Sequence, residues 1–139
     1  MASPPAVELV DRYLAALSSA DPEAAVRLFT RDGVVNSPLY GEQAARDFYP
    51  VLFADTAESV LSLRKTLVSD DGGTIAFWFD FAWVLADGTP APFTVVDVAE
   101  LDEHGLISRL HIVYDTHPIR QSWENQRRSS DSPTDPRRA

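Results

Sequence analysis

The chain has no cysteine, which excludes a disulfide framework and any zinc site built on thiolates. It has only three histidines, without a recognisable ligand spacing, so a metal site would need carboxylates. Basic residues are outnumbered, with 12 Lys and Arg against 21 Asp and Glu, and the formal net charge is −9. Such a chain lacks the electrostatic footprint that nucleic acid or an anionic membrane requires. We therefore expect no metal, no cofactor and neither of those partners.

Long apolar runs are also missing. No stretch of about 18 apolar residues occurs, and residues 1–6 show no basic segment followed by an apolar one. We therefore expect a soluble, cytoplasmic protein. With 45% hydrophobic and 24% charged residues, the 139-residue chain suits one globular domain, expected over residues 1–120. Residues 121–139 are rich in Ser, Arg, Asp and Pro, which predicts a disordered polar tail.

The first half of the chain has the apolar spacing of helices. This spacing covers residues 7–17, then residues 22–29 after a capping Asp21, and then residues 41–53. Pro50 removes a backbone donor and should kink or end the third helix. A short strand ended by proline is predicted over residues 34–38.

The second half has the alternation of strands, over residues 60–68, 74–85, 93–101 and 106–115. The turns between these strands are short, so neighbouring strands should be antiparallel. Helices followed by strands indicate an α+β domain, in which three N-terminal helices pack on a curved antiparallel sheet. We expect the sheet to form a cone-shaped barrel with an internal pocket.

One carboxylic acid, Asp97, lies in the middle of a strand that is apolar on both parities. Such a strand should be covered on both faces, and a buried carboxylate is costly unless it is paired, hydrogen-bonded or protonated. No Arg or Lys lies where it would obviously reach Asp97. Two interpretations remain open: a structural Asp satisfied by backbone donors, or a neutral carboxyl group that donates a hydrogen bond.

The strand over residues 74–85 carries an aromatic face next to this acid. Its odd positions 77, 79, 81 and 83 are Phe, Phe, Phe and Trp, while Trp78 and Asp80 lie on the opposite face. Aromatic side chains with a few polar groups are typical of a pocket for an apolar ligand. The same aromatics could instead only fill the core.

Three stretches together resemble the ketosteroid isomerases of the NTF2-like superfamily, over roughly residues 8–118. Residues 95–107 resemble the strand that bears the acid of the oxyanion hole, residues 12–17 resemble the helix that carries its tyrosine, and Phe48-Tyr49 matches a supporting tyrosine. The resemblance implies the NTF2-like, cystatin-like fold, a homodimer, and an oxyanion hole made by Tyr13 and Asp97. The substrate-binding residues that we expect are Tyr49, Phe77, Phe79, Phe81, Trp83, Val95, Leu110, Ile112 and Tyr114.

Ser37 departs from this resemblance, because the family has a catalytic Asp before the proline that ends the short strand. A serine hydroxyl is not a base near neutral pH. Asp80, Asp115 and His111 all have the parity that points away from the pocket, so none is an easy replacement unless a strand bulges. His104 and His117 are weaker candidates still.

Three functions are compatible with this pattern. The first is a ketosteroid isomerase-like enzyme for a small hydrophobic carbonyl substrate, steroid- or polyketide-like, with Tyr13, Asp97 and Ser37 as its catalytic residues. The second is a SnoaL-like natural-product cyclase or an enzyme like limonene epoxide hydrolase, in which a protein base matters less. The third is a domain that only binds an apolar ligand or forms a dimer, for which an exposed Trp78 would suit the interface.

Overall fold

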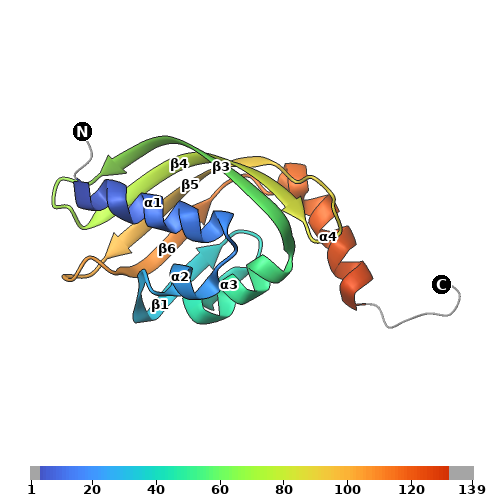
Figure 1. Ribbon diagram of the computed structural model, residues 1–139, viewed down its shortest axis with the longest axis horizontal. Helices are drawn as coiled ribbons and strands as arrows, with labels where there is room; N and C mark the ends of the chain where they lie inside the picture. Colours follow the sequence, from blue (N-terminus) through green and yellow to red (C-terminus); the bar gives the residue numbers. More distant parts are fainter. Residues whose placement is uncertain (1–3, 132–139) are drawn as a thin grey trace, which may run out of the picture.

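A strongly curved sheet with helices against its concave side makes up the body of this computed structural model, which describes residues 4–131 (Figure 1). The α+β class predicted from the sequence is confirmed. The elements in chain order are α1 (Pro4–Ser18), α2 (Pro22–Val26), β1 (Phe29–Ser37), β2 (Gly41–Ala44), α3 (Ala45–Ala54), β3 (Thr56–Val68), β4 (Thr74–Leu85), β5 (Phe93–Leu101), β6 (Ile107–Val113) and α4 (His117–Asp131).

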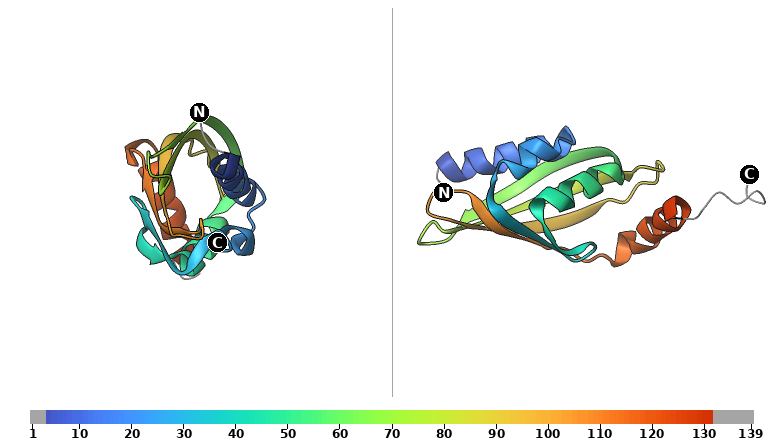
Figure 2. Two further views of the ribbon diagram at one scale, coloured as in Figure 1. Left: turned by 90° about the vertical axis from the view of Figure 1, so that its left-hand side faces the viewer. Right: turned by 90° about the horizontal axis from the view of Figure 1, so that it is seen from below.

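The sheet has the strand order β2-β1-β6-β5-β4-β3 and is open and mixed rather than a closed antiparallel barrel. Strands β3 to β6 are antiparallel neighbours, as their short turns predict. Strand β1, however, runs parallel to β6. The antiparallel prediction is wrong for this pair because four strands and one helix separate β1 from β6 in the chain, so no short turn sets their direction. Seen end-on, the strands curl around a central space, and α1 lies along the open side (Figure 2).

The three N-terminal helices are confirmed, but α2 ends at Val26 rather than at residue 29, because Phe29 already belongs to β1, and α3 starts later than predicted. Asp21 caps α2, because its carboxylate accepts a hydrogen bond from the Ala24 amide at 3.1 Å. Helix α3 begins at Ala45 and not at Gly41, since residues 41–44 pair with β1 as strand β2. Pro50 lies inside α3 and does not end it.

Helix α4 corrects the prediction of a disordered tail. Residues 121–131 are helical, and the remaining part of that predicted tail, residues 132–139, lies outside the described residues. The composition argument missed the spacing of Ile119, Trp123 and Gln126, which fall on one helix face. Gln126 is only 4% exposed; its side-chain oxygen accepts from the Asp87 amide at 2.8 Å, and its amide donates to the Asp55 carbonyl at 3.3 Å.

The aromatic face of β4 points into the core, as predicted. Residues at odd positions from Ile75 to Leu85 are buried, and the rings of Phe77 and Phe79 stack with their centres 5.7 Å apart.

Strand β5 is covered on its concave face only, because Thr94 and Glu100 on the other face are exposed. The expectation of cover on both faces is therefore wrong. No helix within residues 4–131 is both long and apolar enough to cross a membrane.

The docking of α4 can be tested at Gln126. We expect Gln126→Ala to lower the free energy of unfolding by about 1–3 kcal/mol, because it leaves the Asp87 amide without its partner in a half-buried place. Gln121→Ala is the matched control, since Gln121 is exposed and bonds only to Asn125 on the same helix. Urea unfolding measures both variants, and equal losses would mean that α4 is not held to the domain.

Candidate active site

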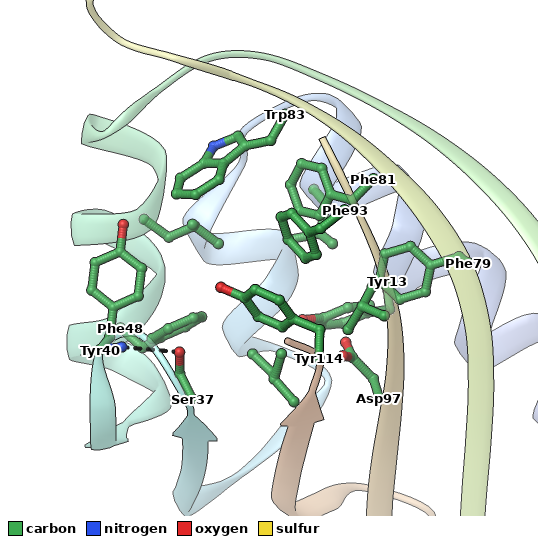
Figure 3. Close-up of a pocket in the computed structure, with 14 residues that line it drawn as sticks. Tyr13, Ser37, Tyr40, Phe48, Phe79, Phe81, Trp83, Phe93, Asp97 and Tyr114 are labelled. Atoms are coloured by element: carbon green, nitrogen blue, oxygen red, sulfur yellow. Dashed lines mark hydrogen bonds between the residues drawn. The ribbon is translucent and has the colours of Figure 1, made fainter. Parts of the chain in front are cut away.

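A pocket opens between the concave face of the sheet and helices α1 and α3 (Figure 3). Its volume is about 40 Å³. In a known case, an engineered cavity of about 150 Å³ takes up benzene. A ring-sized ligand therefore enters this smaller pocket only if lining side chains move. The lining residues are Tyr13, Leu17, Ser37, Tyr40, Phe48, Leu52, Phe79, Phe81, Trp83, Phe93, Val95, Asp97, Ile112 and Tyr114.

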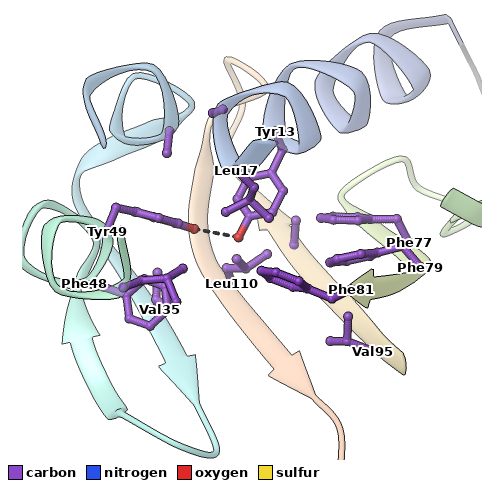
Figure 4. Packing of buried hydrophobic residues seen from close by; sticks show 14 of the residues in the cluster. Tyr13, Leu17, Val35, Phe48, Tyr49, Phe77, Phe79, Phe81, Val95 and Leu110 are labelled. Atoms are coloured by element: carbon purple, nitrogen blue, oxygen red, sulfur yellow. Dashed lines mark hydrogen bonds between the residues drawn. The ribbon is translucent and has the colours of Figure 1, made fainter. Parts of the chain in front are cut away.

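Nine of the twelve residues selected from the sequence line this pocket, including Tyr13, Asp97 and Ser37. The other three, Tyr49, Phe77 and Leu110, are fully buried in the core and lie outside the lining (Figure 4). Sequence reasoning missed five lining residues, although parity or helical spacing pointed to some of them: Phe93 has the parity of Asp97, and Leu17 lies one turn after Tyr13. The missed residues are Leu17, Tyr40, Phe48, Leu52 and Phe93.

Asp97 is buried in the pocket wall without a cation. Its side chain is 2% exposed, and within the described residues its Oδ1 atom has no hydrogen-bond partner. Burial raises the pKa of the Asp97 carboxyl well above its ordinary value, and the nearby Tyr13 hydroxyl offsets this only in part. Burial and the raised pKa favour the protonated form, which is one of the two interpretations that the sequence left open.

Tyr13 lies beside Asp97 and is supported from behind by Tyr49. The Tyr49 hydroxyl donates a hydrogen bond of 2.9 Å to the Tyr13 hydroxyl (Figure 4), so the Tyr13 proton points either to its hydrogen-bond partner Asp97 or to a ligand oxygen. Burial raises the pKa of both tyrosines, so both hydroxyls stay protonated. Tyr13 and Asp97 thus lie side by side in an apolar pocket, within reach of one ligand oxygen (Figure 3).

Ser37 ends β1 at the opposite wall of the pocket and is 5% exposed. Its Oγ atom accepts hydrogen bonds from the amides of Leu39 at 3.2 Å and Tyr40 at 3.1 Å. These bonds hold the turn into β2 and occupy the oxygen as an acceptor. Ser37 is consequently no proton acceptor at the place where the resemblance implies a base.

The other candidate bases lie outside the pocket lining, as their parity predicts. Asp80 is held by Arg64 at 2.9 Å and Thr94 at 2.8 Å, and these bonds lower its pKa. His111 bonds through Nε2 to Glu100 at 2.6 Å, and Asp115 accepts from the His117 amide at 3.0 Å. Residues 4–131 contain no cluster of three or more His, Asp or Glu side chains that could hold a metal ion.

Helix α4 supports one wall of the pocket through Tyr40. The Tyr40 hydroxyl donates to the Asp55 carboxylate at 2.6 Å and accepts from the Trp123 indole at 3.2 Å. The Arg127 guanidinium lies 4.9 Å from the centre of the Trp123 ring. Tyr40 therefore offers its ring to the pocket and its hydroxyl to the helix.

A curved sheet with a pocket between it and the helices is the fold of solved NTF2-like proteins. Residues 10–110 match the family model described as a SnoaL-like domain, so the chain belongs to that family. No curated protein matches the chain.

Several solved structures share the fold. The pinacolase BvnE from Penicillium brevicompactum is 17% identical over 91% of this chain and 97% of its own, with a TM-score of 0.76. The epoxide hydrolase/cyclase-like enzyme SalBIII is 17% identical over 81% and 92%, with a TM-score of 0.70. A ketosteroid isomerase-like protein from Catenulispora acidiphila, solved with trimethylamine, is 16% identical over 85% and 91%, with a TM-score of 0.72. At these identities the likeness establishes the fold alone.

The raised pKa of Asp97 predicts how stability depends on pH. The folded protein keeps the Asp97 proton at pH values where the unfolded chain has lost it, so this group stabilises the fold at low pH. That stabilisation should be lost as pH rises from about 4 toward the folded pKa, by up to about 1.4 kcal/mol per pH unit. We expect Asp97→Asn to remove this slope in urea unfolding from pH 4 to 8.

Asp80→Asn serves as the control, because the pKa of Asp80 is shifted in the opposite direction and its effect on stability has the opposite pH dependence. The Asp80 pKa is lowered, so its stabilisation is present at neutral pH and is lost as pH falls through the folded pKa. If wild type and Asp97→Asn showed the same pH dependence above pH 4, Asp97 would be an ordinary carboxylate in the fold.

Proposed function

We propose that this protein is a ketosteroid isomerase-like enzyme that activates an oxygen of a hydrophobic, steroid- or polyketide-like carbonyl substrate. The observation that carries the proposal is the pairing of Tyr13 with a buried carboxyl group whose Oδ1 has no partner within the described residues. Two O–H donors in an apolar pocket stabilise negative charge as it develops on a carbonyl oxygen. Tyr13 and Asp97 act in this way on the same oxygen.

Ser37 determines which reactions the activated substrate can undergo. Double-bond isomerisation needs a base that takes a proton from one carbon and returns it to another, and such catalysis contributes about 10²–10⁴-fold. Ser37 is engaged as an acceptor by two backbone amides and cannot do this. The site is better suited to reactions in which a nucleophile within the substrate attacks the activated carbon, such as cyclisation or rearrangement.

A second candidate is a SnoaL-like cyclase or an epoxide-opening enzyme. The acidic donors and the lack of a base among the lining residues favour it, because an epoxide oxygen also gains negative charge as its ring opens. Proteins with this fold include a pinacolase and an epoxide hydrolase/cyclase-like enzyme, which agrees with this chemistry. A pocket that binds an apolar ligand without turnover is the remaining alternative.

Placing a carboxylate at position 37 tests whether the site can support isomerisation. Asp can accept the same two amide hydrogen bonds that hold the turn, so Ser37→Asp should fold normally. We expect it to raise kcat/KM for a β,γ-unsaturated ketone at least about tenfold, because the second carboxylate oxygen can shuttle the proton. Ser37→Asn is the matched control of the same shape and should give no gain. Equal activity of the two variants would favour the cyclase or binding functions.

The pairing of Tyr13 and Asp97 can be measured with a phenol as oxyanion mimic and an apolar ligand of the same shape. Tyr13→Phe should cost about 1 kcal/mol of folding stability but weaken phenol binding much more than apolar binding. Asp97→Leu should act alike, and the double variant should lose less than the sum, since both donors serve one oxygen. Isothermal titration of the four proteins decides this. Equal losses for both ligands would make the two residues packing groups only.

The homodimer stays a prediction, supported by an apolar row across the convex face. Trp78, Val96 and Val113 are neighbours on β4, β5 and β6, and Trp78 is 38% and Val113 57% exposed. We expect Trp78→Glu to shift the protein toward monomer in sedimentation experiments, while Val7→Glu on α1 should not. A monomeric wild type would contradict the prediction.

The cytoplasmic location stays a prediction as well.

A further inference from the structure

Two hydroxyl groups in the pocket are not used by the Tyr13–Asp97 pair. The Oγ atom of Ser37 already accepts from two backbone amides, so its remaining capacity is to donate its O–H. The Tyr114 side chain reaches into the pocket (Figure 3), and its hydroxyl makes no hydrogen bond within residues 4–131. Both groups are therefore donors without an acceptor.

The sheet register places Ser37 opposite Asp97 across one strand. Asn36 pairs with His111 in the parallel β1–β6 ladder, so Ser37 follows at the level of Ile112. Ile112 in turn pairs with Asp97 in the antiparallel β5–β6 ladder. Two strand spacings of about 4.8 Å put the Ser37 and Asp97 backbones about 10 Å apart on one level of the concave face.

Tyr114 lies two residues beyond Ile112 and therefore about 7 Å farther along the same face. Its ring stacks on Phe93, with ring centres 4.1 Å apart and planes inclined by 22°. This stacking orients the ring and so sets the position of its hydroxyl. Tyr13 and Asp97 thus share one wall of the pocket, Ser37 lies on the opposite wall, and Tyr114 follows the end of β6, the strand between them.

We propose that Ser37 and Tyr114 form a second polar subsite, which binds a second acceptor oxygen of the substrate while Tyr13 and Asp97 hold the reacting oxygen. This inference rests on the proposed function, which assigns the first oxygen. The substrate class is then an apolar ring compound with two oxygen acceptors at opposite ends. Within residues 4–131 no Arg or Lys lines the pocket, and Arg120, whose charge acts on Tyr114, is held by the Pro38 carbonyl and the Thr116 hydroxyl. A neutral acceptor such as a ketone, ester or ether therefore suits the subsite.

Two naphthalene ligands test the subsite: 2-naphthol, with one oxygen, and 6-acetyl-2-naphthol, with an added carbonyl at the far end. Any cost of opening the pocket is shared by both ligands, so the ratio of their Kd values reports the second oxygen. We expect the wild type to bind the acetyl compound about 10-fold more tightly than 2-naphthol, as one or two hydrogen bonds imply. Equal Kd values for the two ligands would overturn the subsite.

Tyr114→Phe should reduce this preference about 3- to 10-fold, because it removes the hydroxyl and keeps the ring on Phe93. Tyr40→Phe is the matched control, since the Tyr40 ring also lines the pocket while its hydroxyl bonds to Asp55 outside the lining. An unchanged preference in Tyr114→Phe, or the same loss in Tyr40→Phe, would also overturn the subsite.

Ser37→Ala should lower the preference as well, and Ser37→Thr, which keeps the hydroxyl, should retain it. The matched pair matters because Ser37→Ala also removes the acceptor for two backbone amides. Tyr13→Phe separates the two proposals: it should weaken both ligands equally and leave their ratio unchanged. If Tyr13→Phe does not affect 2-naphthol binding, the proposed function fails even where the preference for the second oxygen persists.

Discussion

The carboxyl group of Asp97, buried without a cation, is the constraint on which the site depends. A charged carboxylate in this place would cost several kcal/mol in lost solvation, and no Lys or Arg lines the pocket to offset that cost. This cost raises the pKa of the carboxyl group and favours its protonated form, in which it can donate. Tyr49 donates a hydrogen bond to the Tyr13 hydroxyl, so Tyr13 is a second possible donor in the same apolar space. Together they place two acidic O–H groups in the pocket, which is why we propose that the protein activates an oxygen of its substrate.

The fold supplies this environment through distant parts of the chain. Strand β5 brings Asp97, α1 brings Tyr13 and α3 brings Tyr49, while the aromatic face of β4 lines the space beside them with apolar rings. The far wall depends on the parallel pairing of β1 with β6, which sets Ser37 level with Asp97. The turn from β1 into β2 uses the Ser37 oxygen as the acceptor of two amide hydrogen bonds, which leaves the serine hydroxyl its proton to donate.

Local patterns in the sequence were enough to predict that Tyr13, Asp97 and the aromatic residues of β4 point into the interior, because strand parity and helical spacing determine which side chains share a face. Two features were not predictable in this way. The parallel β1–β6 pairing joins segments with no short connection, so no turn chemistry specifies it. The docking of α4 depends on Trp123 and Gln126, whose partners Tyr40, Asp55 and Asp87 are far away in the chain, and polar composition alone hid it.

Carbon-13 NMR of the Asp97 carboxyl group tests the central claim most directly. In protein labelled at the Asp side-chain carboxyl carbons, with Asp97→Asn used to assign the signal, we expect the Asp97 resonance to keep the chemical shift of a protonated acid at pH 7. It should move when a phenol binds, because its proton then goes into a hydrogen bond with the ligand oxygen. A resonance that titrates near the ordinary value of about 4 and ignores the phenol would contradict a neutral Asp97 as the donor of this site.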